Sequence, residues 1–435
     1  MNDILLENKI KWGCIQPLTG GMYIGAENAI GHKANWVLSY PGLSNIKLNL
    51  DGSIREAGNE YNLLMWCKKR NELPPYQLFN RKPFDAVDIE NVEIIDDDVW
   101  TNEKVNTKNT DIVVSVPVCS GLSQVTIAKD DTKNARNNNM IFNAEYTLKI
   151  INPKIYIFEN APTLFSHSGD FVRSIINDIA KKYDYSIIYY KTNTKLHDNC
   201  QNRPRTFVIM IKNINGKVGC PDVLGEHISP TVSEYFSRIP KNATQQEKVE
   251  LSPMNSLIMK FIKYKYGNNY RNSNYSWSIG AILDNGNEFD KWIDTVNDDK
   301  KIIDKLKAHI NHIRYKLSLN KNYYSIAPGW MTEKSQIAPV CMFKTVLTSL
   351  HYKEDRLLTA REWLHLMGHP ADFELYGEYK LNYSKIGQNV PVRTAQFIVS
   401  EAARIVNNWN TIPRNNPEIY MFDNTKEKPK TNKIF

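Results

Sequence analysis

The stretch DIVVSVPVCSGLS, residues 111–123, places a strand-sized apolar run directly before a Gly/Ser loop that carries a cysteine. Apolar runs of similar length recur at 12–18, 36–40, 92–95, 155–158, 185–190 and 206–211. Between them, residues 139–151 and 169–182 repeat apolar side chains at helical spacing. This alternation predicts an α/β domain with a doubly wound, mostly parallel sheet, whose chemistry lies at the carboxyl ends of the strands.

The pattern divides the chain into four parts. Residues 1–212 form the α/β part, in which the Gly- and Pro-rich segment 51–90 is expected to be a loop-rich insertion. Residues 213–355 lose the alternation, apart from a helix at about 299–317, and predict a second domain. Residues 356–412 return to helical periodicity at 358–367 and 392–409 and complete the first domain. Residues 413–435 form a polar, basic tail, expected to be mobile.

Composition narrows the class of protein. The 435 residues are 42% hydrophobic, enough for a sizeable core, and no apolar run approaches the roughly 20 residues of a membrane span. The first residues lack the apolar core of a secretory signal, so we expect a cytoplasmic protein with no membrane association. Six scattered cysteines predict neither a disulfide framework nor a structural metal.

The charge balance favours a polyanionic partner. Lysine and arginine exceed aspartate and glutamate by 55 to 47, a formal charge of +8. Residues 241–330 contain 14 basic and 9 acidic residues. Their local surplus of positive charge is over half of the total of +8. Four histidines are expected to pack or to cap helices rather than to bind a metal, because no cysteine or carboxylate cluster accompanies them in the sequence. They are His309, His312, His365 and His369.

Three sets of residues could carry chemistry. Cys119 follows a buried strand, and loop N–H groups can favour its nucleophilic thiolate; the alternative is a buried structural thiol. Glu159 ends another strand, where burial would raise its pKa and suit a proton donor; the alternative is a cap or salt-bridge partner. Arg203 and Arg205 alternate on an extended segment and could clamp an anion, unless they are a solvated surface pair.

Taken in order, five motifs resemble those of cytosine-C5 DNA methyltransferases, particularly phage-type ones: VPVCSGLS, FENAP, QNRPR, RLLTAREWLHLMGHPADF (356–373) and IGQNVPVRTAQFI (386–398). GGMYIGAENAIG (20–31) resembles the opening cofactor loop of that family. The resemblance implies a Rossmann-like methyltransferase fold. It also implies a catalytic domain over 1–212, completed by 356–412, and a target-recognition domain over 213–355.

The resemblance assigns roles to the candidates. Cys119 matches the nucleophile that adds to carbon 6 of cytosine, and Glu159 matches the acid at ring nitrogen N3. Arg203 and Arg205 match the pair that steadies the active-site loop, the base and the backbone. The remaining matches in these motifs form the substrate loop and its support: Ser120, Gly121, Ser123, Asn160 and Gln201. Such enzymes flip the target base out of the duplex to reach it.

The same resemblance implies S-adenosylmethionine as cofactor. The residues matched to its site are Gly20, Gly21, Gly25, Tyr40, Asp96, Asp97, Pro117, Gln388 and Asn389. Where the family carries an acidic residue for the ribose after the second strand, this chain has Ser39. In the last motif the asparagine of the family's Gly-Asn turn is displaced by one position, to Asn389.

The expected function is methylation of carbon 5 of cytosine in double-stranded DNA by a metal-free, monomeric enzyme, through a covalent Cys119 adduct. Two alternatives stay open. One is the same chemistry on RNA, and the other is a DNA-binding relative that has lost catalysis.

Overall fold

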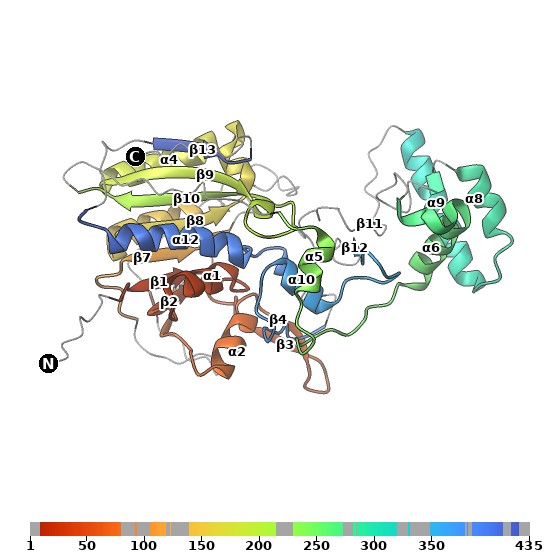
Figure 1. The fold of residues 1–435 in the computed structure, drawn as a ribbon, viewed down its shortest axis with the longest axis horizontal. Helices are drawn as coiled ribbons and strands as arrows, with labels where there is room; N and C mark the ends of the chain where they lie inside the picture. The colour runs from red at the N-terminus through yellow and green to blue at the C-terminus, as the bar shows by residue number, and fades with distance from the viewer. Residues whose placement is uncertain are drawn as a thin grey trace.

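The computed structural model describes residues 9–79, 92–93, 105–118, 122, 139–214, 229–272, 282–283, 285–319, 329–330, 349–378, 381, 385–411 and 419–425. In this part of the chain a large α/β domain is built on one sheet, and a smaller helical unit lies beside it (Figure 1). The parallel strands run toward the helical unit, so their carboxyl ends face it (Figure 1).

The central sheet has nine strands in the order β13-β9-β10-β8-β7-β1-β2-β5-β6. Their bounds are β1 Trp12–Ile15, β2 Trp36–Ser39, β5 Tyr76–Phe79, β6 Val92–Glu93, β7 Ile112–Ser115, β8 Ile155–Asn160, β9 Tyr185–Asn193, β10 Pro204–Lys212 and β13 Ile419–Asp423. Neighbouring strands pair in parallel except β6 with β5 and β10 with both of its neighbours. The predicted doubly wound, mostly parallel sheet is confirmed.

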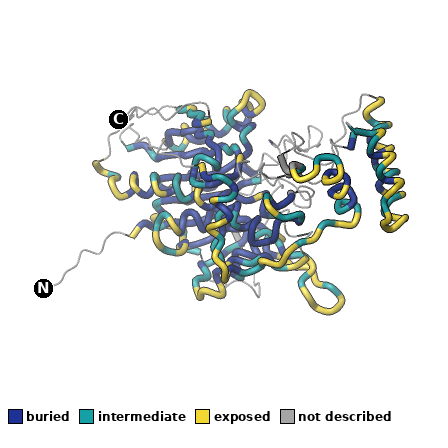
Figure 2. Tube along the Cα trace, turned by 45° about the vertical axis from the view of Figure 1, so that its right-hand side comes forward, coloured by how far each residue is buried: buried dark blue, intermediate teal, exposed yellow. Residues whose placement is uncertain are grey.

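Helices cover both faces of the sheet. On one face α1 (Gly21–Ile30), α10 (Ala360–Leu366) and α12 (Val392–Asn407) share an apolar core with the inner side chains of β1, β7 and β8. On the other face α4 (Asp170–Lys182) and residues 139–146, which continue as the π-helix η1 (Thr147–Ile151), form a second core. Figure 2 shows the sheet buried between these layers. The strands are apolar on both faces because both are covered.

The segment expected to be a loop-rich insertion is ordered where the structure describes it. Helix α2 (Tyr61–Lys69) packs its buried side into the main core, and β5 pairs in parallel with β2 inside the central sheet. A small hairpin of β3 (Ile46–Leu48) and β4 (Ile54–Ala57) precedes them. The prediction of a loop-rich insertion is therefore wrong for this part of the chain. Its helix and strands are too short to show a clear period in the sequence.

The C-terminal tail also adds structure. Strand β13 pairs in parallel with β9 at the edge of the sheet. Lys191 of β9 forms an ion pair with Asp423 of β13, with 3.0 Å between Nζ and Oδ2. The Asn424 amide donates to the Tyr190 hydroxyl at 2.8 Å. Residues 419–425 thus form an ordered edge of the sheet, in contrast to the mobile tail that the polar composition predicted.

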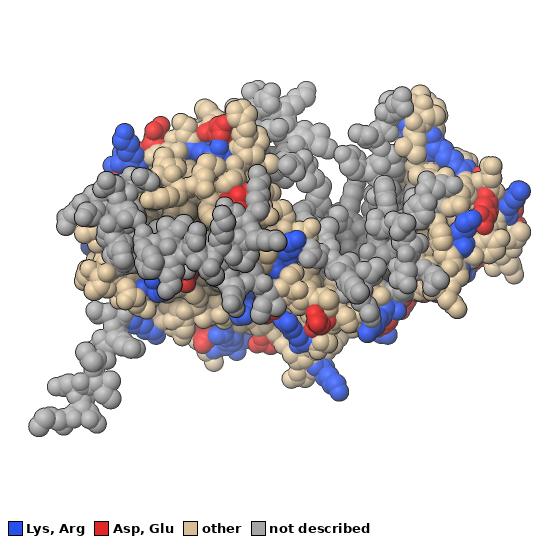
Figure 3. Space-filling view, turned by 45° about the horizontal axis from the view of Figure 1, so that its top comes forward, with Lys and Arg blue, Asp and Glu red and all other residues tan. Residues whose placement is uncertain are grey.

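The second unit is helical. Helices α6 (Pro253–Tyr266), α8 (Gly286–Ile293) and α9 (Lys300–Ser318) pack around their own apolar cluster, which includes Phe261, Phe289 and Ile310. Basic and acidic side chains alternate on its surface (Figure 3), and ion pairs such as Lys260–Asp298 join them. The remaining elements are α5 Val232–Ser237, β11 Gly329–Trp330, β12 Ser349–Leu350, and the short turns η2 Pro162–Phe165, η3 His167–Gly169, η4 Thr194–Leu196 and η5 Gly267–Asn272.

Two kinds of feature are absent from the described residues. None of the helices there is long and apolar enough to cross a membrane. No group of three or more His, Cys, Asp or Glu side chains in the same ranges could hold a metal ion.

Candidate active site

Glu159 and Arg205 meet at the carboxyl end of β8. Arg205, near the start of the antiparallel neighbour β10, places its Nε 2.8 Å from Oε1 of Glu159. Glu159 is 5% exposed, and burial raises the pKa of its carboxyl, while the nearby charges of Arg205 and Arg203 oppose that shift. The result is a desolvated carboxylic group with a raised pKa at the edge where α/β sheets bind ligands.

Arg203 contacts a different group. Its Nη2 donates to the backbone carbonyls of Gly387 and Asn389, at 2.7 and 2.8 Å, and the side chain is 1% exposed. Gln201 is also buried and donates to the Leu366 carbonyl at 3.1 Å. These two residues of the QNRPR motif therefore fasten the C-terminal segments to the sheet, whereas Arg205 meets the candidate acid.

The glycines of the first loop allow close packing. Gly20 has φ +93°, a left-handed conformation that favours glycine, and it begins α1. A Cβ on Gly21 would lie 1.8 Å from the carbonyl oxygen of Val390, and one on Gly25 would lie 2.5 Å from the Ala395 Cβ. The N-terminal end of α1 is thereby held against the turn that precedes α12.

That turn separates two of the predicted site residues. Asn389 is fully buried, and its Oδ1 accepts from the backbone N–H of Gly21 at 2.8 Å. Gln388 is exposed, and its Oε1 accepts from the Asn59 amide at 2.9 Å. The structure brings Asn389 to the first loop and leaves the side chain of Gln388 at the surface.

Tyr40 follows the second strand as expected, but its ring is fully buried. It lies 4.8 Å from the ring of Phe79, and its hydroxyl donates to Asn143 Oδ1 at 3.2 Å. The residue before it, Ser39, donates from its hydroxyl to the carboxylate of Glu60, at 2.6 Å to either oxygen.

Glu60 was missed by the sequence reasoning. It is fully buried, and burial raises its pKa to about 8, opposed by hydrogen bonds from Ser39 and from the backbone N–H of Leu18. The sequence signal that could have revealed Glu60 was a single acidic residue just before α2, but this segment was expected to be a loop. A carboxyl group thus lies beside the first loop, although the end of β2 carries a serine.

The nucleophile loop is described only at its edges. Pro117 is buried, and the backbone N–H of Val118 donates to Asn139 Oδ1 at 2.8 Å. Asn160 is buried at the end of β8, and its Oδ1 accepts from the N–H of Ala161 at 2.9 Å. Six predicted site residues lie outside the described residues: Cys119, Ser120, Gly121, Ser123, Asp96 and Asp97.

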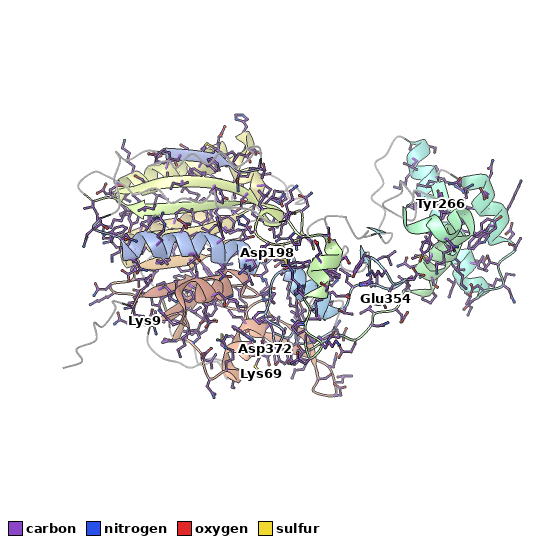
Figure 4. All side chains as sticks on the ribbon, viewed as in Figure 1. Lys9, Lys69, Asp198, Tyr266, Glu354 and Asp372 are labelled. Carbon is purple, nitrogen blue, oxygen red and sulfur yellow. The ribbon has the colours of Figure 1, made fainter. Side chains whose placement is uncertain are left out.

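A pocket of about 1180 Å³ lies at the opposite edge of the sheet, lined among others by Lys9, Asp111 and Lys154. Figure 4 shows Lys9 on that side, while Asp198 lies on the side of α5 and α10. The pocket adjoins residues that precede β1, β7 and β8. It is therefore remote from the carboxyl edge that carries Glu159.

Comparisons with known proteins show the family of this chain. The family model described as "C-5 cytosine-specific DNA methylase" matches residues 76–404. Type II methyltransferase M1.HphI of Haemophilus parahaemolyticus is 23% identical over 305 residues, 70% of this chain and 71% of that protein. Type II methyltransferase M.BbvI of Brevibacillus brevis is 24% identical over 58% of this chain and 60% of its own length.

Two solved structures align with most of the chain at low identity. The Dnmt2 methyltransferase of S. pombe aligns with a TM-score of 0.48 at 11% identity, over 92% of this chain and 99% of that one. The methyltransferase EhMeth of Entamoeba histolytica aligns with a TM-score of 0.48 at 12% identity, over 92% and 98%. Because the family model covers 329 of the 435 residues, this chain belongs to the C-5 cytosine-specific DNA methylase family, whose methyl donor is S-adenosylmethionine.

Proposed function

We propose that Cys119, Glu159 and Arg205 form the catalytic centre of this enzyme, acting on a cytosine flipped out of duplex DNA. The observation that carries the proposal is the ion pair between buried Glu159 and half-buried Arg205 at the carboxyl end of β8. Strand β7, which leads into the Cys119 loop, pairs in parallel with β8, so both motifs leave the sheet at the same edge.

The chemistry follows from these groups. The Cys119 thiolate forms a bond to carbon 6 while Glu159 donates a proton to N3, which places the electron pair of the ring on carbon 5. When bound beside this centre, S-adenosylmethionine would supply the methyl group that carbon 5 takes up, its sulfonium becoming a neutral thioether. Loss of the carbon 5 proton to a base then restores the ring double bond, expels the thiolate from carbon 6 and returns the N3 proton. Covalent addition divides one difficult substitution into two easier steps.

Arg205 holds Glu159 in place through its ion pair, and its charge favours the carboxylate once the proton has been donated. In this proposal Arg203 and Gln201 hold the segments 387–389 and 366–367 against the site. Asn160 orders the end of β8, and the substrate loop comprises Ser120, Gly121 and Ser123.

The residues present fit the cofactor. The Gln16 Oε1, at the end of β1, is buried without a hydrogen-bond partner among the described residues. Gly20 and Gly21 let the first loop pack closely against Leu63 and Val390, which holds its backbone in place. We place the cofactor at the carboxyl ends of β1 and β2, in contact with the loop that Gly25 and Asn389 support. The other proposed contacts are Tyr40, Pro117, and Asp96 or Asp97; exposed Gln388 contributes its backbone at most.

The residues 213–355 are proposed to recognise the DNA target. The helical unit faces the carboxyl edge of the sheet (Figure 1), and the sequence of this region is rich in basic and amide side chains. The enzyme is proposed to act as a monomer, because the Glu159–Arg205 pair and the contact of Arg203 with the 387–389 turn are both made within one chain.

The test is transfer of labelled methyl groups from S-adenosylmethionine to mixed-sequence duplex DNA and to total RNA. Wild type is expected to label DNA as 5-methylcytosine, and Cys119→Ala is expected to abolish labelling. On duplexes with 5-fluorocytosine, where fluorine replaces the departing proton, wild type should form a denaturation-resistant complex that Cys119→Ala does not form. Labelling of RNA alone would establish the RNA alternative. A folded wild type that labels neither would establish the inactive DNA-binding alternative.

A further inference from the structure

The side chain of Asn389 links two parts of the chain that are remote in sequence. Its Oδ1 accepts from the backbone N–H of Gly21, at the start of α1, and its Nδ2 lies 2.8 Å from Nε2 of His369. All three residues are buried. The amide is therefore held from both ends in an interior position.

These contacts determine the protonation of His369. The N–H of Gly21 can only donate, so the oxygen end of the Asn389 amide must face it, and the amide nitrogen must face the imidazole. Because that nitrogen also donates, Nε2 of His369 must accept and carry no proton. The ring is therefore neutral, with its proton on Nδ1.

The surroundings keep His369 in that state. Burial, with a smaller contribution from the charge of Arg361, lowers the pKa of His369 to about 3. The ring stacks on Phe373 at 4.3 Å between centroids, and the backbone N–H of His369 donates to Leu364 at 3.0 Å. Gly368, with φ +77°, turns the chain so that the ring reaches Asn389. Nδ1 of His369 has no hydrogen-bond partner among the described residues. Within that part of the chain, the ring therefore makes its hydrogen bond to Asn389.

The backbone of the same turn is fixed independently by Arg203, which donates to Gly387 and Asn389. A separate support for the side chain is needed because an asparagine amide can rotate about χ2. With the nitrogen end toward Gly21, two donors would face each other in a buried place. His369 removes that alternative by accepting from the nitrogen.

We propose that His369 is a positioning residue for S-adenosylmethionine: by accepting from Asn389 it directs Oδ1 of that residue onto Gly21 and so fixes the cofactor loop. The inference rests on the proposed assignment of Gly20 and Gly21 to the cofactor site. It concerns binding of the cofactor rather than the chemical step.

The first test is calorimetric titration of S-adenosylmethionine into full-length variants. His369→Gln keeps an acceptor near Nε2 and is expected to bind within about threefold of wild type. His369→Leu removes the acceptor and leaves the Asn389 amide nitrogen buried without a partner, so its Kd is expected to rise about tenfold or more. His365→Leu is the matched control, because it also removes a histidine hydrogen bond, to the Tyr235 carbonyl, without contact to Asn389.

A melting temperature for each variant separates folding from binding. If His369→Leu and His365→Leu are equally destabilised and bind the cofactor alike, His369 is merely structural and the proposal is wrong. Failure of His369→Gln to restore binding would contradict it as well. If wild type itself binds no S-adenosylmethionine, the proposed cofactor loop is wrong, and the inference about His369 fails with it. That outcome is distinguishable, because it appears in wild type and not only in the variants.

A second test uses no ligand. The ¹⁵N shifts of the His369 ring are expected to show the Nδ1–H tautomer unchanged between pH 5 and pH 8. A ring that protonates in that range, or one that carries its proton on Nε2, would overturn the proposal. This measurement remains informative even if His369→Leu does not fold.

Discussion

Arg205 Nε lies 2.8 Å from Glu159 Oε1, which joins a half-buried arginine near the start of β10 to a buried carboxyl near the end of its antiparallel neighbour β8. Burial raises the pKa of Glu159 while the arginine opposes that shift. The pair therefore sets how readily the carboxyl group holds and releases a proton, and it lies at the edge of the sheet where the parallel strand β7 also ends.

Replacing the acid should abolish most of the activity. We expect Glu159→Gln to lower kcat by roughly 10²–10⁴, because a positioned proton donor contributes that much to catalysis. Binding of duplex DNA, measured by fluorescence anisotropy, should change little. Activity above a tenth of wild type would contradict the assignment of Glu159 as the acid.

The pH dependence of kcat should respond to Arg205. Glu159 donates only when protonated, so activity should fall as pH rises through its pKa. Arg205→Gln removes a charge that lowers this pKa, so the descending limb should move to higher pH by roughly one unit. Arg238→Gln is the control, because Arg238 pairs with Asp198 instead. If the descending limb of the pH profile does not move in Arg205→Gln, the pKa of Glu159 does not determine that limb.

Stability should depend on pH through Glu60. Its pKa is raised to about 8 in the folded protein, so between about pH 4.5 and pH 8 the folded state binds the proton more tightly than the unfolded chain. Stability from this group is therefore present at low pH and is lost as pH rises, by at most about 1.4 kcal/mol per unit.

The measurement is the free energy of unfolding in urea at pH 5 and pH 8. Glu60→Gln keeps a hydrogen-bonding side chain without the titration, so its loss of stability over this range should be smaller than that of wild type. Equal losses in the two proteins would contradict a neutral, buried Glu60.

A methyl group at Gly21 should damage the cofactor loop. Its Cβ would lie 1.8 Å from the carbonyl oxygen of Val390, so backbone must move, and we expect Gly21→Ala to cost about 1–3 kcal/mol and to weaken cofactor binding. Gly286→Ala is a suitable comparison, since its φ is not left-handed and its Cβ would meet only the flexible end of the Arg314 side chain, at 3.0 Å. Thermal melting and calorimetry would measure both effects. Equal behaviour of the two variants would contradict the close packing at Gly21.

Removing the C-terminal strand should destabilise the sheet but spare the chemistry. A chain that ends at Thr411 loses five cross-strand pairs between β13 and β9, worth about 2 kcal/mol together, and exposes an edge prone to association. A chain that ends at Thr425 keeps β13 and should resemble wild type in melting temperature and in light scattering. Equal melting temperatures for the two truncations would contradict a stabilising role for β13.

The sequence by itself determined the elements and the order of the motifs. Buried strands such as Ile112–Ser115 and Ile155–Asn160 are apolar runs, and α12 shows a helical period, so local patterns sufficed to predict an α/β domain. The motifs also pointed to Glu159 as a candidate at the end of a buried strand and to Arg203 and Arg205 at the start of another, and the ends of strands lie at a predictable edge of the sheet.

Only the tertiary structure decided which partners these residues have. Arg203 binds carbonyls more than 180 residues away, His369 orients Asn389 toward Gly21, and Glu60 meets Ser39 across a segment taken for an insertion. Strands β5 and β13 joined the sheet although each is short and β13 lies within a polar tail. Periodicity records which face of an element is buried, whereas the partner on that face depends on packing between distant segments, which a local pattern does not encode.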